Sequence, residues 1–163
     1  MGVPDVCCDS VLRLPSPPLV PGPSAVTEHL KLDPVPASVG VARRFVRDLL
    51  DGLDGLDGVD EDALDTLLLL ASELVTNAIL HAHTPVELGV CVDGDRALVC
   101  VADRMPGSEP LTPRDHSRDR PGGRGLALVA DLSDDWGTTT FTGGKTVWFT
   151  MPLTTTSHQV VAS

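Results

Sequence analysis

The sequence is poor in aromatic residues, with three Phe, two Trp and no Tyr among its 163 residues. Apolar residues nevertheless make up 42% of the chain, so a folded core has to be built mainly from aliphatic side chains. A chain of this length suits a single domain that buries most of its apolar surface on folding. The composition therefore predicts one globular domain with an aliphatic core.

Basic residues are also scarce. The chain has 12 Lys and Arg against 23 Asp and Glu, which gives a formal net charge of -11 at pH 7. Because a protein that binds DNA or RNA needs a basic face for the phosphates, this balance argues against direct nucleic-acid binding. It fits a protein that stays dispersed in solution or that binds basic partners.

The sequence lacks the signals of a membrane or exported protein. No stretch approaches the ~18 consecutive apolar residues that a membrane span needs, and the N-terminus lacks the basic start and apolar core of a signal peptide. We therefore expect a cytoplasmic protein without a membrane segment. The four cysteines lack the paired spacing of a zinc site and are expected to be free thiols. His81 and His83 have no third ligand nearby, so a metal site there is not expected.

Proline content divides the chain. Residues 1–24 hold six prolines and little periodicity, which is typical of a disordered segment. We expect this segment to lie outside the fold, residues 25–153 to form the domain, and residues 154–163 to be a polar tail.

The longest periodic stretch runs from Asp60 to about residue 84 and predicts an amphipathic helix. Asp60 is a good N-cap, and Pro85 ends the pattern. A carboxylate, an amide and an imidazole recur every fourth residue and project from one side; they belong to Glu73, Asn77 and His81. Such a row is most often a solvated helix face, so it indicates a functional site only if the rest of the chain supports one.

Shorter elements flank this helix. Residues 25–32 predict a strand, and residues 37–50 predict a second amphipathic helix whose Arg43, Arg44 and Arg47 face outward. The acidic repeat at 51–58 lacks the EF-hand pattern and is interpreted as a turn-rich linker.

Two strands, 86–92 and 97–103, flank a four-residue loop at 93–96 and predict a hairpin. Strand alternation places Asp103 on the same face as the apolar residues beneath the helices. A buried carboxylate is costly unless it is hydrogen-bonded. A ligand that carries an amino group would provide that bond.

A glycine-rich turn, Gly122-Gly123-Arg124-Gly125, leads directly into an apolar helix. Backbone N–H groups and the positive helix end make such a turn suitable for phosphate. The turn alone is weak evidence, because it matches neither a dinucleotide-binding fingerprint nor a P-loop. Before it, residues 104–121 contain four prolines and no periodicity, which indicates a functional or disordered loop. After it, 137–141 and 145–151 predict a second hairpin.

The order of these features resembles the GHKL ATP-binding fold shared by histidine kinases, gyrase-type topoisomerases and heat-shock chaperones. The stretches ELVTNAILHA, GGRGLALVADLSDDWG and GGKTVWF are most similar to the small anti-sigma regulatory serine/threonine kinases. The resemblance covers roughly residues 25–153. It implies an α+β fold of the Bergerat type: a two-layer sandwich with a mixed, mainly antiparallel sheet and helices on one face.

The resemblance also gives three residues a role that their chemistry allows. Asn77 matches the asparagine that holds the Mg²⁺ ion bridging the phosphates of ATP. Glu73 matches the acidic residue that orients or deprotonates the attacking hydroxyl. Asp103 matches the aspartate that accepts a hydrogen bond from the adenine amino group.

Further ATP-binding positions follow from the same resemblance. Gly107 matches the glycine that closes the adenine box, and Thr146 matches the threonine that joins Asp103 around the base. The phosphate-binding turn is matched by Gly123, Arg124, Gly125 and Leu126. One position departs from the family pattern, because Met105 replaces the first glycine of the adenine box and its Cβ could crowd the base.

The function implied is an ATP-binding anti-sigma regulator. Such a protein binds a sigma factor and phosphorylates a serine or threonine of an anti-anti-sigma (STAS-domain) antagonist, and the family resemblance also implies a homodimer. The alternative is a module of the same fold that sequesters a partner with nucleotide or without it, and that transfers no phosphate. Retention of Glu73 and Asn77 favours the kinase, and Met105 favours the alternative.

Overall fold

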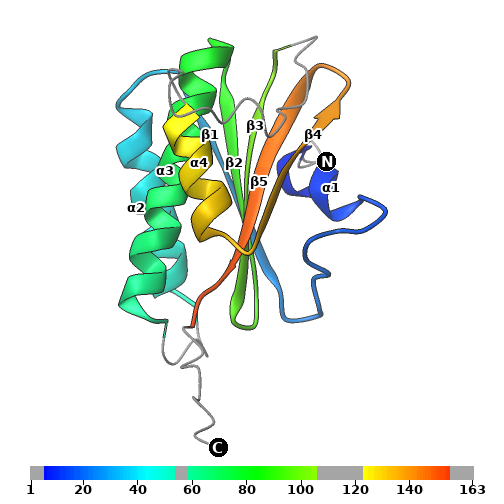
Figure 1. Cartoon of the computed structure of the whole chain (residues 1–163), viewed down its shortest axis with the longest axis vertical. Helices are drawn as coiled ribbons and strands as arrows, with labels where there is room; N and C mark the ends of the chain where they lie inside the picture. Colours follow the sequence, from blue (N-terminus) through cyan, green and yellow to red (C-terminus); the bar gives the residue numbers. More distant parts are fainter. Residues whose placement is uncertain (1–5, 54–58, 106–122, 155–163) are drawn as a thin grey trace, which may run out of the picture.

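The computed structural model describes residues 6–53, 59–105 and 123–154. Within these ranges the chain forms four helices: α1 (Val6–Leu12), α2 (Ser38–Asp51), α3 (Glu61–Ala82) and α4 (Gly123–Leu132). It also forms five strands: β1 (Val26–Leu32), β2 (Val86–Asp93), β3 (Arg96–Asp103), β4 (Asp135–Phe141) and β5 (Gly144–Pro152). The strands make one sheet in the order β1-β2-β3-β5-β4 (Figure 1).

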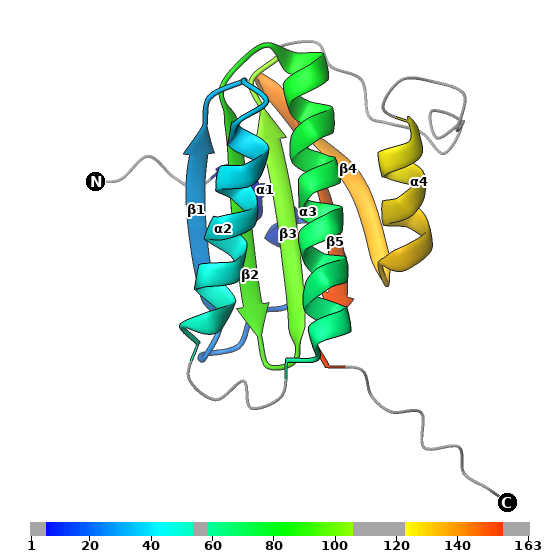
Figure 2. The same cartoon turned by 90° about the vertical axis from the view of Figure 1, so that its left-hand side faces the viewer.

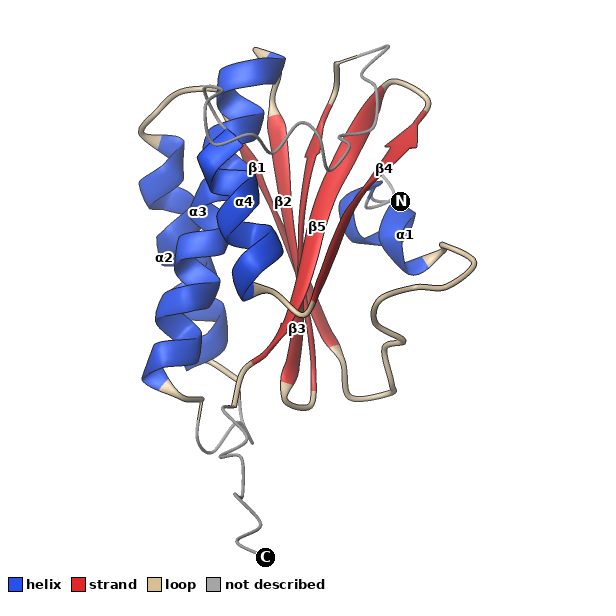
Figure 3. Ribbon diagram, in the orientation of Figure 1, coloured by secondary structure: helices blue, strands red, loops and turns tan. Residues whose placement is uncertain are grey.

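The helices lie on both faces of this sheet. Helices α2, α3 and α4 cover one face, and α1 lies against the other (Figures 1 and 3). The predicted α+β fold is confirmed, with two differences. Every neighbouring pair of strands is antiparallel, so the sheet is not mixed, and the helices are not restricted to one face.

Helix α3 is the central element of the helical layer. The Asp60 side chain caps it by accepting a hydrogen bond from the Asp62 N–H (3.2 Å), and two acidic residues follow in the first turn, where the helix dipole favours negative charge. The helix ends at Ala82, because His83 adopts a left-handed conformation with φ 51°. The predicted helix is therefore confirmed, two residues shorter at its C-terminal end.

No run of ~18 consecutive apolar residues occurs in α3, but its mean hydropathy is high. By length and hydropathy this helix is the one candidate span among the described residues. However, 61% of its most apolar window is buried inside the domain. The apolar character of α3 is accounted for by packing against α2, α4 and the sheet.

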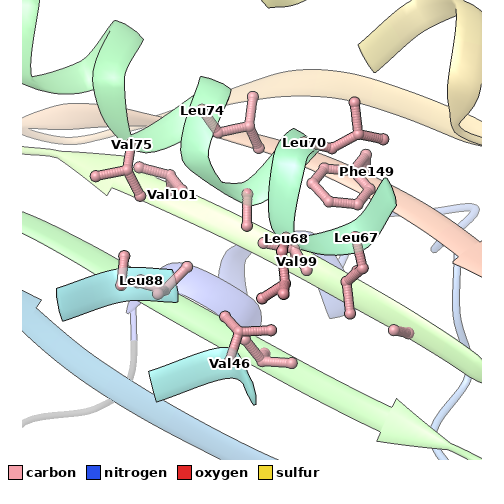
Figure 4. Packing of buried hydrophobic residues seen from close by; sticks show 14 of the residues in the cluster. Val46, Leu67, Leu68, Leu70, Leu74, Val75, Leu88, Val99, Val101 and Phe149 are labelled. Carbon is pink, nitrogen blue, oxygen red and sulfur yellow. The ribbon is translucent and has the colours of Figure 1, made fainter. Parts of the chain in front are cut away.

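The main core lies between α3 and the sheet and is aliphatic, as the composition predicts. Figure 4 shows Leu67, Leu70 and Leu74 of α3 packed beside Phe149 of β5 and Val99 of β3. Helix α2 adds Val46 at the edge of the same cluster. The core therefore holds one side of α3 against the centre of the sheet. The remaining sides of α3 lie next to α2 and α4.

The β2–β3 hairpin is tighter than the sequence predicts. Asp93 and Arg96 still pair, so the loop has two residues rather than four, and Gly94 provides the positive φ of 59° that the turn requires. The predicted register is unaffected: Leu88 lies opposite Val101. The faces of both strands therefore agree with the prediction.

The prediction that residues 1–24 lie outside the fold is wrong for the part that the structure describes. Helix α1 packs on the sheet face opposite α3, where Cys8 and Val11 are fully buried and Leu19 is 7% exposed. They cover apolar residues that point away from α3, namely Cys91, Leu98, Cys100, Ala102 and Trp148. Because β2, β3 and β5 are apolar on both faces, the sheet needs cover on its second face.

This packing makes a testable prediction about stability. Replacing the buried Val11 with aspartate is expected to lower the free energy of unfolding by about 3 kcal/mol or more, because it buries a charge without a partner. Val20 is 75% exposed in the same segment, so Val20→Asp is the matched control and should change stability little. Urea denaturation of both variants measures the difference. Equal effects would contradict the packing of α1.

Candidate functional site

Four segments far apart in the sequence lie toward the same end of the molecule, around α3. They are the C-terminal half of α3, the end of β3, the start of β5 and the start of α4 (Figure 2). Helix α3 contacts both α4 and the sheet strands β3 and β5. This end of the domain therefore brings together the chain segments that carry most of the predicted site residues.

Asp103, the last residue of β3, is a buried carboxylate at this end of the domain. Its side chain is 3% exposed and lies on the helix side of the sheet, because it shares strand parity with the core residues Val99 and Val101. The backbone N–H of Met105 donates to Asp103 Oδ1 at 3.0 Å, and Lys145 Nζ lies 3.9 Å from Oδ2. These two partners offset part of the cost of burying the carboxylate. The predicted orientation of Asp103 is confirmed.

Thr146 does not lie beside Asp103, contrary to the prediction. On β5, Val147 and Phe149 face α3, whereas Trp148 faces α1. Thr146 shares the parity of Trp148, and its hydroxyl lies 3.1 Å from Ser10 Oγ of α1. The residue opposite Asp103 in the ladder is Lys145.

Lys145 is thus a site residue that the sequence analysis missed. The signal was the alternation along GKTVWFTMP, in which Val147 and Phe149 mark the core face and place Lys145 on it. Because Trp148 makes the other face apolar as well, alternation alone did not decide which face lies beneath the helices. The structure decides it.

Glu73 lies against the first turn of α4. A Cβ atom placed on Gly125 would clash with the Glu73 carboxylate and would come within 3.3 Å of Glu73 Cβ. Only glycine at position 125 leaves this carboxylate its present place. The structure therefore brings Glu73 and Gly125 together, as the predicted site requires.

The row of polar residues on α3 is not a uniformly solvated face. Asn77 is 6% exposed, Glu73 is half-buried, and His81 is exposed. Along α3, the three residues run from Glu73, which contacts Gly125 of α4, to His81 in the last turn of the helix. Asn77 is therefore enclosed between a partly covered acid and an exposed imidazole, which supports a site at Asn77 and leaves His81 outside it.

A second residue that the sequence analysis missed lies beside Glu73. Ser72 is buried, and its hydroxyl donates to the Leu68 carbonyl oxygen (2.6 Å) and accepts from Arg43 Nη1 (3.1 Å). Arg43 was expected only to face solvent; it is exposed, and it also ties α2 to α3 one residue before Glu73. Nothing local in the sequence indicates this bond, because its two residues are 29 positions apart.

Other predicted positions are only partly described. Gly107 and the loop at 106–122 lie outside the described residues, as does the side chain of Arg124. Gly123 begins α4. Leu126 is 3% exposed and belongs to the main core, so its side chain packs inside the domain. Met105 is 44% exposed.

Comparison with known protein families decides the family. The model of the histidine kinase-like ATPase domain matches residues 32–151, which is most of the chain and includes every element from the end of β1 to β5. The chain belongs to the histidine kinase-like ATPase domain family.

The solved structures that match this chain are distant in sequence. The RsbU and RsbW domains of Rv1364c from Mycobacterium tuberculosis match with a TM-score of 0.58 and 20% identity over 78% of this chain. This chain spans about a third (32%) of that protein's length. The histidine kinase domain of the blue-light activated histidine kinase from Erythrobacter litoralis EL346 matches over 72% of this chain and 60% of its own, with 22% identity and a TM-score of 0.45. No curated protein matches.

Membership of the histidine kinase-like ATPase family implies ATP as the ligand, and the donor groups fit it. Asp103 offers a carboxylate acceptor, and α4 begins with the backbone N–H groups of a glycine turn, which suit phosphate. In the described part of the chain, His, Cys, Asp and Glu form no group of three or more that could hold a metal. The Asn77 side-chain oxygen is a hard donor that would hold a Mg²⁺ ion together with phosphate oxygens and water.

Proposed function

We propose that this protein is an ATP-dependent serine/threonine protein kinase of the anti-sigma type, acting in the cytoplasm. It sequesters a sigma factor, and it phosphorylates a serine or threonine of a STAS-domain antagonist. The observation that carries the kinase part is the packing of the Glu73 carboxylate against Gly125. In this contact Glu73, the candidate base, lies beside the N-terminal end of α4, whose backbone N–H groups suit phosphate. The anti-sigma part rests on the resemblance of ELVTNAILHA and GGRGLALVADLSDDWG to that branch.

In the proposed reaction, catalysis is mainly positioning and charge stabilisation. Glu73 orients the hydroxyl of the antagonist and takes its proton as the hydroxyl oxygen bonds to the γ-phosphorus. The bond from that phosphorus to the departing ADP oxygen breaks. The N–H groups at the start of α4 stabilise the phosphate charge, and Asp103 holds the base. Mg²⁺, when bound at Asn77, neutralises negative charge on the phosphates.

The proposed partners are proteins rather than nucleic acid. The formal net charge of -11 disfavours a phosphate backbone. Arg44 and Arg47 are exposed on α2, so they are candidates for the surface that meets an acidic partner. A homodimer is part of the same proposal.

A second candidate function is sequestration of a partner without phosphoryl transfer. Met105 in place of a glycine favours it.

Two measurements distinguish these functions. The first is titration of a fluorescent ATP analogue with and without Mg²⁺, in which we expect saturable binding that Mg²⁺ strengthens. The second is transfer of radiolabelled γ-phosphate to a STAS-domain protein encoded beside this chain. ATP binding without any transfer would favour sequestration, and absence of both would overturn the proposed kinase.

The contact between Glu73 and Gly125 gives a further prediction. Gly125→Ala is expected to lower the transfer rate by about a hundredfold, since the added methyl group displaces the carboxylate and small misplacements have effects of this size. Stability should change little, because alanine favours the helix, the clash is with the mobile carboxylate, and the contact with Glu73 Cβ needs a shift of only a few tenths of an ångström. Gly40 on α2 has nothing within 4 Å of an added Cβ, so Gly40→Ala is the matched control. Initial transfer rates and urea midpoints of both variants are compared, and equal transfer rates would contradict the prediction.

A further inference from the structure

We propose that Lys145 reads the nucleotide base together with Asp103, by donating a hydrogen bond to the ring nitrogen (N1) beside the amino group of adenine. This inference rests on the proposed function, because it concerns the same nucleotide. It assigns the position beside Asp103 to a cation, where the family resemblance led us to expect a threonine hydroxyl.

The backbone holds Lys145 next to Asp103. The two residues are direct partners in the antiparallel β3–β5 ladder, so their side chains leave the sheet on the same face as neighbours. The strands are close at this point: a Cβ on Gly144 would clash with the Asp103 carbonyl oxygen and with the Phe141 ring. Because residue 144 is a glycine, the first residue of β5 can pack closely against the end of β3. Lys145 is the next residue of β5 and pairs with Asp103.

The environment of Lys145 is unusual for a lysine. Its side chain is 13% exposed, whereas lysines are mostly exposed unless they are paired. The only other lysine of the chain, Lys31, is exposed on the edge strand β1. A nearly buried ammonium group requires acceptors around it. In the described part of the chain, the charged group beside it is the Asp103 carboxylate.

The distance between the two charges leaves both able to bind a ligand. Lys145 Nζ lies 3.9 Å from Asp103 Oδ2, which is longer than the 2.7–3.2 Å or so of a hydrogen bond. Asp103 Oδ2 can therefore still accept, and the ammonium group can still donate. The remaining oxygen of Asp103, Oδ1, is already used by the Met105 N–H. The pair presents one acceptor beside one donor.

Adenine has the complementary pair of groups on one edge. Its amino group is a donor, and the neighbouring ring nitrogen N1 is an acceptor. The inference places the amino group on Asp103 Oδ2, the oxygen not used by Met105, and turns the base so that N1 rather than N7 faces Lys145 Nζ. Guanine presents a carbonyl oxygen and an N–H on the same edge, so GTP serves as the competing base in the test.

The test compares two ligands on two proteins. ATP and 1-deaza-ATP, in which N1 is replaced by a C–H group, are titrated against the full-length wild type and against Lys145→Met, which keeps the aliphatic stem and removes the charge. We expect the wild type to bind ATP roughly tenfold or more tightly than 1-deaza-ATP, since a hydrogen bond to a charged group is worth at least that factor. The variant is expected to bind both ligands with equal affinity. Lys31→Met is the control and should keep the wild-type preference.

Each other outcome overturns the inference. If the wild type binds both ligands equally, no donor reads N1. If Lys145→Met keeps the preference, another group reads it, and Lys145 only holds Asp103 in place. If GTP binds more tightly than ATP, the base is not adenine. If Lys145→Met does not fold, Lys145→Leu takes its place, and a folded Lys145→Leu that keeps the wild-type preference for ATP overturns the inference. If the wild type does not bind ATP at all, the proposed function is wrong. The inference depends on that function, so it is then wrong too.

Discussion

Asp103→Asn is expected to lower the affinity for ATP by about a hundredfold or more. The substitution either turns an NH₂ donor toward the adenine amino group or leaves that amino group facing a weaker, uncharged acceptor. It also removes the charge that faces Lys145 Nζ at 3.9 Å, so a nearly buried ammonium group loses its charged partner. Isothermal titration calorimetry with ATP and Mg²⁺ measures the effect.

The control for this variant is Asp65→Asn, which makes the same chemical change at an exposed position of α3 and should leave ATP affinity unchanged. Circular dichroism checks that both variants are folded. Binding of ATP by folded Asp103→Asn with wild-type affinity would remove Asp103 from the site, and with it the argument for an adenine nucleotide.

Glu73→Gln is expected to lower the rate of phosphoryl transfer by roughly 10²–10⁴-fold, the range typical for loss of a general base. Glutamine has almost the same shape, so the contact with Gly125 is kept while the proton acceptor is lost. Because Glu73 is not proposed to hold the base or the phosphates, ATP affinity should stay close to that of the wild type. The two quantities are measured by radiolabelled transfer to the STAS-domain partner and by titration of a fluorescent ATP analogue.

Glu61→Gln is the matched control, since Glu61 is an exposed acid in the first turn of the same helix. It should leave transfer unchanged. A Glu73→Gln protein that transfers phosphate at the wild-type rate would show that Glu73 is not the base. The kinase proposal would then need another group, or the sequestration alternative would be favoured.

Local patterns predicted most of the elements correctly. The 3.6-residue periodicity from Asp60 to Ile79 produces α3, and alternation in β2 and β3 gives the register that puts Asp103 on the helix side. These predictions succeed because hydrophobic period and strand parity depend on residues close in sequence. The length of the β2–β3 loop was wrong by two residues, since a glycine at position 94 can turn the chain more tightly than composition reveals.

Predictions about the sheet faces failed where they depended on distant segments. Proline content indicated that residues 1–24 lie outside the fold, yet Val11 and Leu19 are buried against β3 and β5. The three central strands have apolar residues on both faces, and only the assembled sheet shows that a second layer must cover them. The misplacement of Thr146 has the same origin, because its face depends on which side of β5 meets α3.

By itself, the sequence determined most of the elements from β1 onward, the aliphatic core and the ordered motifs that point to the histidine kinase-like ATPase family. Only the tertiary structure decided which side chains meet: Lys145 with Asp103, Glu73 with Gly125, and Arg43 with Ser72. The physical reason is that each of these contacts joins residues between 29 and 52 positions apart. Their meeting depends on how α2, α4 and β5 pack around α3 and β3, and no local periodicity encodes that packing.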